Sequence, residues 1–186
     1  MHLDVALPAT TPSARLTSLT AADAREFAVH ISSDLERLSV FLPWPALTAD
    51  EAGAAAWLGR YDTGDEGRAL VAGLRVGGRL LGGVVLFRHD EHSASAELGC
   101  WAVAEGEGRG LVRAGCVEAL RVARSGLRAE RVVWQSDPAN TRSRALAERL
   151  GFHHEGTLRS AYVLRDERRD SDLLSLVGVE LDRAVS

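Results

Sequence analysis

The chain has 186 residues, of which 46% are hydrophobic and 26% are charged, and its net charge is −4 at pH 7. This length is enough to bury a sizeable core, so a single domain over residues 1–186 is predicted. An acidic balance argues against a dedicated nucleic-acid-binding protein, whose surface is basic. The first residues lack the basic start and apolar core of a secretory signal, and arginines interrupt the most apolar region of the chain. We therefore expect a cytoplasmic protein without a membrane span.

The first third of the chain mixes strand and helix signals. Thr20 and Asp23 have the spacing of a capping box, which satisfies backbone N–H groups at a helix start. The prolines of Phe41-Leu42-Pro43-Trp44-Pro45 must interrupt helical structure, because proline lacks a backbone donor. The expected elements are a loose leader over 1–14, a strand over 15–19, a helix over 20–38 and a second helix capped by Thr48.

The middle of the chain predicts a β-hairpin. Strand-like segments 69–76 and 79–87 flank Gly77-Gly78, and paired glycines supply the positive φ that short hairpin turns require. The elements expected after it are a strand over 94–103, a helix over 110–123, a strand over 131–135, a helix over 138–150, and strands over 152–162 and 171–181.

Two strand-to-helix junctions carry the candidate binding residues, and the first is the glycine-rich turn Gly106-Glu107-Gly108-Arg109-Gly110. Unpaired N–H groups and the positive end of the helix dipole at such a turn bind a pyrophosphate group without any particular side chain. Alone the turn is a weak signal, because a helix entry often needs small residues. Its spacing is not that of a Rossmann fold, and no P-loop lysine follows it.

The second junction begins at Asp137, which is expected to cap the next helix with Pro138 at its first position. Asn140 is the only asparagine of the chain. Its amide either pairs with an extended ligand or only forms part of the first turn of the helix. Ser143 lies one turn later on the same side and presents its hydroxyl either to the same groove or to solvent. Two such junctions in this order predict an acyl-CoA site.

Several segments together carry a resemblance to a known family. They are Phe41-Leu42-Pro43-Trp44, Ala96-Glu97-Leu98-Gly99-Cys100-Trp101, Glu107 to Val112, Asp137 to Ser143, Leu150-Gly151-Phe152, and Glu155 to Arg159 with Tyr162. With them the chain, over residues 15–181, resembles the GNAT superfamily of acyl-CoA-dependent N-acyltransferases, most closely the RimJ/RimL-type ribosomal-protein N-terminal acetyltransferases. The resemblance implies an α/β (α+β) GNAT fold. Its mixed, mostly antiparallel central sheet has about seven strands, is splayed at the cofactor site and is flanked by helices.

The resemblance also implies where acetyl-CoA binds. The pantetheine arm is expected to lie like an extra strand between the strand that ends at Val103 and the strand that ends near Ser136. The implied cofactor-binding residues are Ala102, Val103, Gly108, Arg109, Gly110, Leu111, Val112, Arg113 and Asn140. Leu42 and Trp44 are implied to border the acceptor pocket, with core packing as the alternative for Trp44. Relatives of this type are often dimers, so a homodimer is a candidate assembly.

The chain departs from the family pattern within the glycine-rich turn. Glu107 stands where glutamine or arginine is usual, and Val112 stands where glycine or alanine is usual. A carboxylate beside a pyrophosphate is unfavourable by Coulomb repulsion, although water screens the repulsion at an exposed loop and Arg109 and Arg113 can offset it. These departures are the main support for a catalytically inert alternative.

Acyl transfer to an amine requires the neutral form of the amine. A free α-amino group has a pKa of about 7.7–8.0, against about 10.4 for lysine, so an α-amine needs only modest help from a base. Glu97 is the candidate base, and a polar residue on the wet face of the sheet is the alternative interpretation. Ser143 is the second candidate catalytic residue, as a partner of the departing thiol.

The predicted function is transfer of an acetyl group from acetyl-CoA to a primary amine, with a protein N-terminal α-amine as the candidate acceptor. One alternative is an acetyl- or succinyltransferase for a small-molecule amine, and another is an inert GNAT module that binds CoA or a partner protein. No nucleic-acid or membrane partner is expected. His89 and His92 are typical of a solvated turn, and Cys100 and Cys116 lack the spacing of a zinc or redox pair, so no metal is predicted.

Overall fold

The computed structural model describes residues 3–185 except 8–9, 11–12 and 63–69. For residues 62, 88 and 89 it describes the backbone but not the side chain. One eight-stranded sheet, in the order β1-β2-β3-β4-β5-β6-β8-β7, forms its centre. The strands are β1 (Asp4–Leu7), β2 (Ala14–Ser18), β3 (Leu70–Val76), β4 (Arg79–Asp90), β5 (Ser95–Ala102), β6 (Arg131–Ser136), β7 (His153–Leu164) and β8 (Glu167–Val177). Only β5 and β6 are parallel neighbours among these strands; the other pairs are antiparallel.

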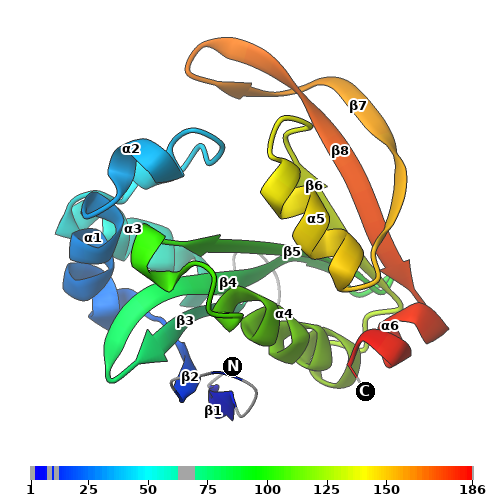
Figure 1. The fold of residues 1–186 in the computed structure, drawn as a ribbon, viewed down its shortest axis with the longest axis horizontal. Coiled ribbons are helices and arrows are strands. Elements are labelled where there is room, and N and C mark those ends of the chain that lie inside the picture. Colours follow the sequence, from blue (N-terminus) through cyan, green and yellow to red (C-terminus); the bar gives the residue numbers. More distant parts are fainter. Residues whose placement is uncertain (1–2, 8–9, 11–12, 63–69, 186) are drawn as a thin grey trace.

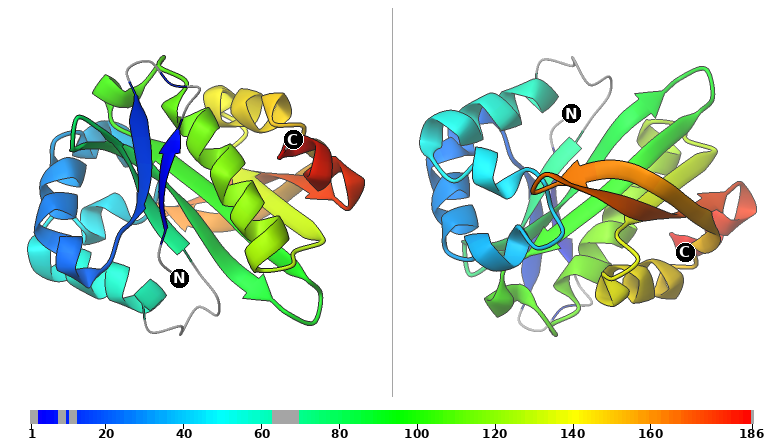
Figure 2. Two further views of the ribbon diagram at one scale, coloured as in Figure 1. Left: turned by 90° about the horizontal axis from the view of Figure 1, so that it is seen from below. Right: turned by 90° about the horizontal axis from the view of Figure 1, so that it is seen from above.

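Helices cover both faces of this sheet (Figures 1 and 2). The α-helices are α1 (Ala24–Ser32), α2 (Leu35–Leu38), α3 (Glu51–Asp62), α4 (Leu111–Arg121), α5 (Thr141–Arg149) and α6 (Val179–Ala184). Short helical turns are η1 (Ala21–Asp23), η2 (Pro45–Leu47), η3 (Ala104–Gly106) and η4 (Val122–Gly126). Helices α1 and α3 lie on one face, whereas α4 and α5 lie on the other.

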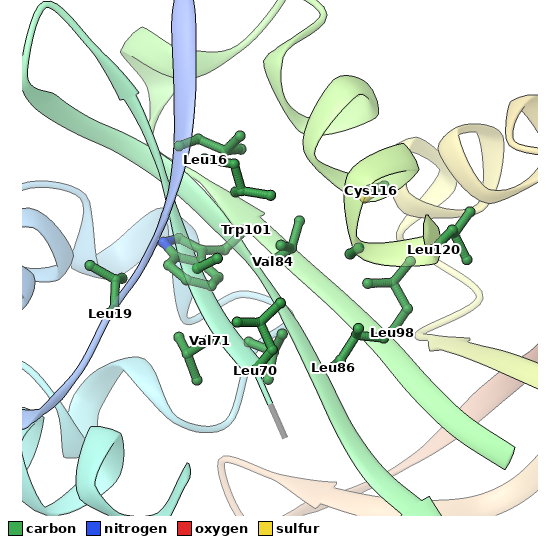
Figure 3. Close-up of a cluster of buried hydrophobic side chains, with 14 of the residues drawn as sticks. Leu16, Leu19, Leu70, Val71, Val84, Leu86, Leu98, Trp101, Cys116 and Leu120 are labelled. Atoms are coloured by element: carbon green, nitrogen blue, oxygen red, sulfur yellow. The ribbon is translucent and has the colours of Figure 1, made fainter. Parts of the chain in front are cut away.

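The core fills the space between the central strands and these helices. Leu86 of β4 and Leu98 of β5 lie toward α4, close to Cys116 and Leu120 (Figure 3). Each large apolar side chain buried in this way contributes about 1.5–3 kcal/mol to the free energy of folding. These contacts fix β5 and α4, the strand and helix that flank the glycine-rich turn.

The predicted hairpin and the predicted capping box are confirmed. Gly77 and Gly78 have φ values of +56° and +82° and connect β3 to β4. The backbone N–H of Thr20 donates to the carboxylate of Asp23 at 2.8 Å, and helix formation starts there.

The two ends of the chain differ from expectation. The leader expected over 1–14 contains β1, which pairs with β2 from Asp4↔Thr17 to Leu7↔Ala14, so the sheet has eight strands instead of about seven. Four residues alternate too briefly to signal a strand, and the pairing comes from the sheet edge. At the other end β8 stops at Val177, and the residues expected to extend it form α6.

Two helix boundaries also differ. The helix expected over 20–38 is divided, because α1 ends at Ser32 and α2 begins at Leu35. Thr48 does not cap α3; its buried hydroxyl donates to the carbonyl oxygen of Pro45 at 3.2 Å. The side chain of Asp50 instead accepts the Gly53 N–H at 2.8 Å, at the start of α3.

Candidate active site

Strands β5 and β6 diverge at the position expected for the site. Their parallel register runs from Ser95↔Arg131 to Glu97↔Val133. Beyond these pairs β5 continues to Ala102 along β4, and β6 continues to Ser136 along β8. Within the described part of the chain no strand pairs between their final segments, which separate in Figure 1. The backbone edges that face this gap can pair with an extended ligand as with an additional strand.

The glycine-rich turn after β5 leaves the start of α4 open. Gly110 precedes the helix with a φ of +71°, and no side chain caps the first turn. A Cβ at Gly108 or Gly110 would meet nothing within 4 Å, so the left-handed backbone, and not crowding, favours glycine there. Leu111 is buried and Val112 half-buried, so at this helix start they offer mainly backbone N–H groups. Such an uncapped start fits an anionic group.

The second junction corrects the expected helix cap. Asn140, and not Asp137, precedes α5, and its Oδ1 accepts the Ser143 N–H at 3.1 Å. The buried Asp137 closes the turn before the helix: one carboxylate oxygen accepts a backbone N–H two residues later, and the other accepts the Tyr162 hydroxyl at 2.9 Å. Pro138 therefore lies in that turn and not at the first helical position. Because the cap uses the amide oxygen of Asn140, the amide nitrogen is the group that can donate to a ligand.

Ser143 lies beside the point where the strands part. Its hydroxyl oxygen accepts the Trp134 Nε1–H at 3.0 Å. Trp134 is the first β6 residue beyond the last β5–β6 register pair. The Ser143 hydroxyl is therefore held close to the apex of the gap.

Glu97 occupies the same apex on the other face of the sheet. It is half-buried and stands in register with Phe87 of β4 and Val133 of β6. Because side chains alternate along a strand, Val133 shares the face of Glu97, and Trp134 and its partner Ser143 lie on the opposite face. The structure thus brings the two candidate catalytic residues to one gap from opposite faces.

Trp44 belongs to a block of aromatic rings beside this site. Its ring centroid lies 4.9 Å from that of Trp57 and 6.0 Å from that of Phe27, and it meets Trp101 edge-on at 5.6 Å. Trp44 and Leu42 are both half-buried and pack against the core. Core packing thus accounts for part of the Trp44 surface, and the remainder stays accessible.

A buried histidine holds this aromatic block in place. The Trp101 Nε1–H donates to His30 Nε2 at 3.1 Å. Burial lowers the pKa of His30 from 6.5 to about 4, against the opposing effect of its hydrogen bond with the Leu80 backbone. His30 is therefore neutral at physiological pH, as an acceptor for the indole requires.

Arg37 of α2 joins the end of β5 to the glycine-rich turn. Its guanidinium group donates to the Ala102 carbonyl oxygen at 2.6 Å and contacts Asp34 at 2.5 Å and Glu107 at 2.5 Å. The Val103 N–H donates to the Leu81 carbonyl oxygen at 3.1 Å. Two backbone groups that were expected to meet the cofactor therefore already have partners within the protein.

Glu107, the residue that departs from the family pattern, contacts a second arginine. Its other carboxylate oxygen lies 2.7 Å from the guanidinium of Arg142, in the first turn of α5. The carboxylate is thus paired on both sides. This arrangement reduces the repulsion that Glu107 alone would exert on a nearby anion.

The remaining predicted cations lie on the surface around α4. Arg109 and Arg113 are exposed. Arg113 lines a surface cavity of about 350 Å³ between α4, α5 and α6, together with Arg149 and Arg183. The cations of this cavity were not predicted as a group, because they come from three separate helices.

The described residues contain no cluster of three or more His, Cys, Asp or Glu side chains suited to a metal ion, and the side chain of His89 lies outside this description. Among the same residues, no helix combines the length and apolar character needed to cross a membrane.

Comparison with known proteins identifies the family. Residues 14–153 match the family model described as an acetyltransferase (GNAT) domain. YdaF of Bacillus subtilis, assigned as a ribosomal N-acetyltransferase, is 31% identical over 160 residues, which cover 83% of this chain and 86% of YdaF.

Solved structures share the fold. RimJ of Mycobacterium smegmatis, in complex with a CoA disulfide, has a TM-score of 0.85 at 20% identity, covering 97% of this chain and 88% of RimJ. RimL, the ribosomal L7/L12 α-N-protein acetyltransferase in complex with coenzyme A, has a TM-score of 0.83 at 17% identity, and the match covers 94% of this chain and 98% of RimL. The gap, the glycine-rich turn and these matches agree: the chain belongs to the GNAT family and is an acyl-CoA-dependent N-acetyltransferase.

Proposed function

We propose that this N-acetyltransferase transfers the acetyl group of acetyl-CoA to the α-amino group of a protein N-terminus. The observation that carries the proposal is the gap between β5 and β6, which has an uncapped helix start at its outer end and Glu97 with Ser143 at its apex. The similarity to YdaF supports a ribosomal-protein acceptor. RimL, which shares the fold, acts on an α-amine and binds coenzyme A.

The residues around the gap fit acetyl-CoA. The α4 N-terminus would hold its pyrophosphate through backbone N–H groups, with Gly108 and Gly110 giving a close approach. The amide nitrogen of Asn140 would donate to a carbonyl group of the pantetheine arm. When bound, acetyl-CoA supplies an activated thioester, and the protein supplies position and proton transfer.

Glu97 is proposed to take the proton that the amine loses as its nitrogen forms the new bond to the acetyl carbon. It lies on the same face of β5 as Trp101, whose ring belongs to the aromatic block that would border the acceptor. About a tenth of α-amines are already neutral near pH 7. The main task of Glu97 is therefore to accept the proton that the neutral amine loses as it attacks, and not to deprotonate a charged amine beforehand.

Ser143 is proposed to assist the thiol that leaves when the carbon–sulfur bond breaks. Its oxygen already accepts the Trp134 N–H, which directs the hydroxyl hydrogen elsewhere. That hydrogen can form a hydrogen bond to the departing thiolate sulfur and stabilise its charge. A thiol pKa of about 8.5 makes the leaving group stable, so the assistance is modest.

The inert alternative is weakened by the surroundings of Glu107. Its negative charge would oppose an anion at the α4 start, but Arg37 and Arg142 pair with it. Val112 is half-buried and presents its backbone to the same helix start. Neither departure from the family pattern removes the anion-binding geometry.

The test measures CoA thiol release with a panel of acceptors: peptides with free α-amines, the same peptides blocked at the N-terminus but carrying lysine, and small polyamines. Release with only the free α-amines supports the proposal. Release with only the small amines would assign the protein to metabolite modification. Glu97→Gln should lower kcat about 100-fold or more with an unchanged CoA Kd; an unchanged kcat would remove Glu97 from the base role.

A further inference from the structure

Arg142 and Glu107 form an ion pair across the mouth of the gap. Glu107 belongs to the turn that follows β5, and Arg142 belongs to the helix that follows β6. The distance between their Nη2 and Oε2 atoms is 2.7 Å. The pair therefore links the two junctions at the place where an acyl-CoA phosphate would approach the start of α4.

The position of Arg142 is electrostatically unusual. The first turn of a helix favours anions, yet α5 has no acidic side chain there and carries two arginines, Arg142 and Arg144. The helix dipole disfavours a cation at this position by about 0.3–1 kcal/mol, and a nearby anion offsets that cost. Glu107 supplies that anion from the other junction.

The two partners of Glu107 differ in exposure and in how many other groups they contact. The Arg142 side chain is 71% exposed, so it can change partner with little disturbance of the packing. Arg37 is 36% exposed and is also held by Asp34 and by the Ala102 carbonyl oxygen. Glu107 would thus keep Arg37 when Arg142 moves.

We propose that Arg142 binds a phosphate group of acyl-CoA and that Glu107 is the partner it exchanges for that phosphate. The proposal rests on the proposed acetyl-CoA site. It assigns two opposite effects to one ion pair: Arg142 attracts the co-substrate, whereas Glu107 competes with it for Arg142. The pyrophosphate carries one negative charge on each of its two phosphates, against a single charge on the carboxylate, which favours the exchange.

The experiment is calorimetric titration of the full chain with CoA. Arg142→Ala should raise the Kd about two- to fivefold, and Arg142→Lys should recover part of the loss. Glu107→Gln should lower the Kd by a similar factor, because Arg142 no longer has to leave a charged partner. If Arg142→Ala instead binds CoA more tightly, Arg142 blocks the site and the proposal is wrong.

A matched control separates this exchange from a general change of charge. Glu105 lies two residues earlier in the same loop and pairs with Arg79 of β4 at 2.5 Å, away from α5. Glu105→Gln removes the same charge as Glu107→Gln but should leave the Kd unchanged. Equal effects of the two variants would contradict a specific role for Glu107.

A second ligand tests the phosphate itself. The Arg142→Ala effect should be present with 4′-phosphopantetheine or CoA and absent with pantetheine, which lacks phosphate, and it should diminish as NaCl is raised. An equal effect on pantetheine would show that Arg142 acts only on the shape of the gap. If the wild-type chain binds CoA but these variants do not differ, only this inference fails; if no form binds CoA, the proposed function fails with it.

Discussion

The indole N–H of Trp134 donates to the hydroxyl oxygen of Ser143 at 3.0 Å, so the remaining hydrogen of Ser143 is the one it can donate at the apex of the gap. This one contact defines the direction of the hydroxyl. It gives a structural reason for treating Ser143 as a donor to the leaving sulfur and not as a base.

Ser143→Ala should lower kcat about three- to tenfold at pH 7, because a thiol with a pKa of about 8.5 needs little help to leave. The loss should be the same between pH 6.5 and 9.5, because the serine hydroxyl does not titrate in this range. The measurement is kcat between pH 6.5 and 9.5 for both proteins. A kcat equal to that of the wild type across this range would contradict a hydrogen bond from Ser143 to the departing sulfur.

Asn140 combines a helix cap with a proposed ligand contact, and two substitutions separate them. Asn140→Asp keeps an oxygen for the Ser143 N–H but loses the amide donor, so stability should be retained while the Kd for CoA rises. Asn140→Ala should also lose about 1 kcal/mol of unfolding free energy. Urea unfolding and calorimetry check the two effects; an unchanged CoA Kd in both variants would leave Asn140 as a cap alone.

His30 should make stability fall at acidic pH. Its folded pKa of about 4 lies below its usual 6.5, so the unfolded chain takes up the proton first. The contribution of neutral His30 to the free energy of unfolding is fully present above pH 6.5. It is lost as the pH falls towards 4, by about 3 kcal/mol in total. Urea unfolding at pH 7, 5.5 and 4.5 measures it. His30→Gln should flatten this part of the profile; a profile identical to that of the wild type would exclude His30 as its source.

Cys116 should resist thiol reagents in the folded protein. A hydrogen bond with the Cys100 thiol and complete burial raise the pKa of Cys116 well above its usual value. Labelling with a maleimide, followed by mass analysis of peptides, should modify Cys116 only after denaturation. Rapid labelling in the native state would show that α4 opens from the sheet. Cys100, which is half-buried, serves as the internal comparison.

Local signals in the sequence account for much of the fold. Gly77-Gly78 predicts its hairpin because few other pairs adopt positive φ at both positions. At the second junction the same kind of reasoning selects the wrong cap, since Asp137 and Asn140 are both good capping residues. In the structure the Asp137 carboxylate accepts bonds from the turn before the helix and from Tyr162, and Asn140 caps the helix.

Long-range charge pairing is the part that the sequence does not reveal. Arg37 precedes Glu107 by 70 positions in the chain, and no periodicity connects them. Arg142 resembles any exposed helix arginine until the fold places it opposite Glu107. The sequence thus predicts which residues follow each strand, but the two junctions meet only through the sheet.

The parallel register between β5 and β6 comprises three residue pairs, from Ser95↔Arg131 to Glu97↔Val133. Strands β1 to β5 and strands β6 to β8 are therefore two antiparallel units that share a short line of hydrogen bonds. We expect a ligand strand that pairs with both units to extend this short line of hydrogen bonds. Native-state amide exchange along β5 and β6 should then become slower when the ligand is bound.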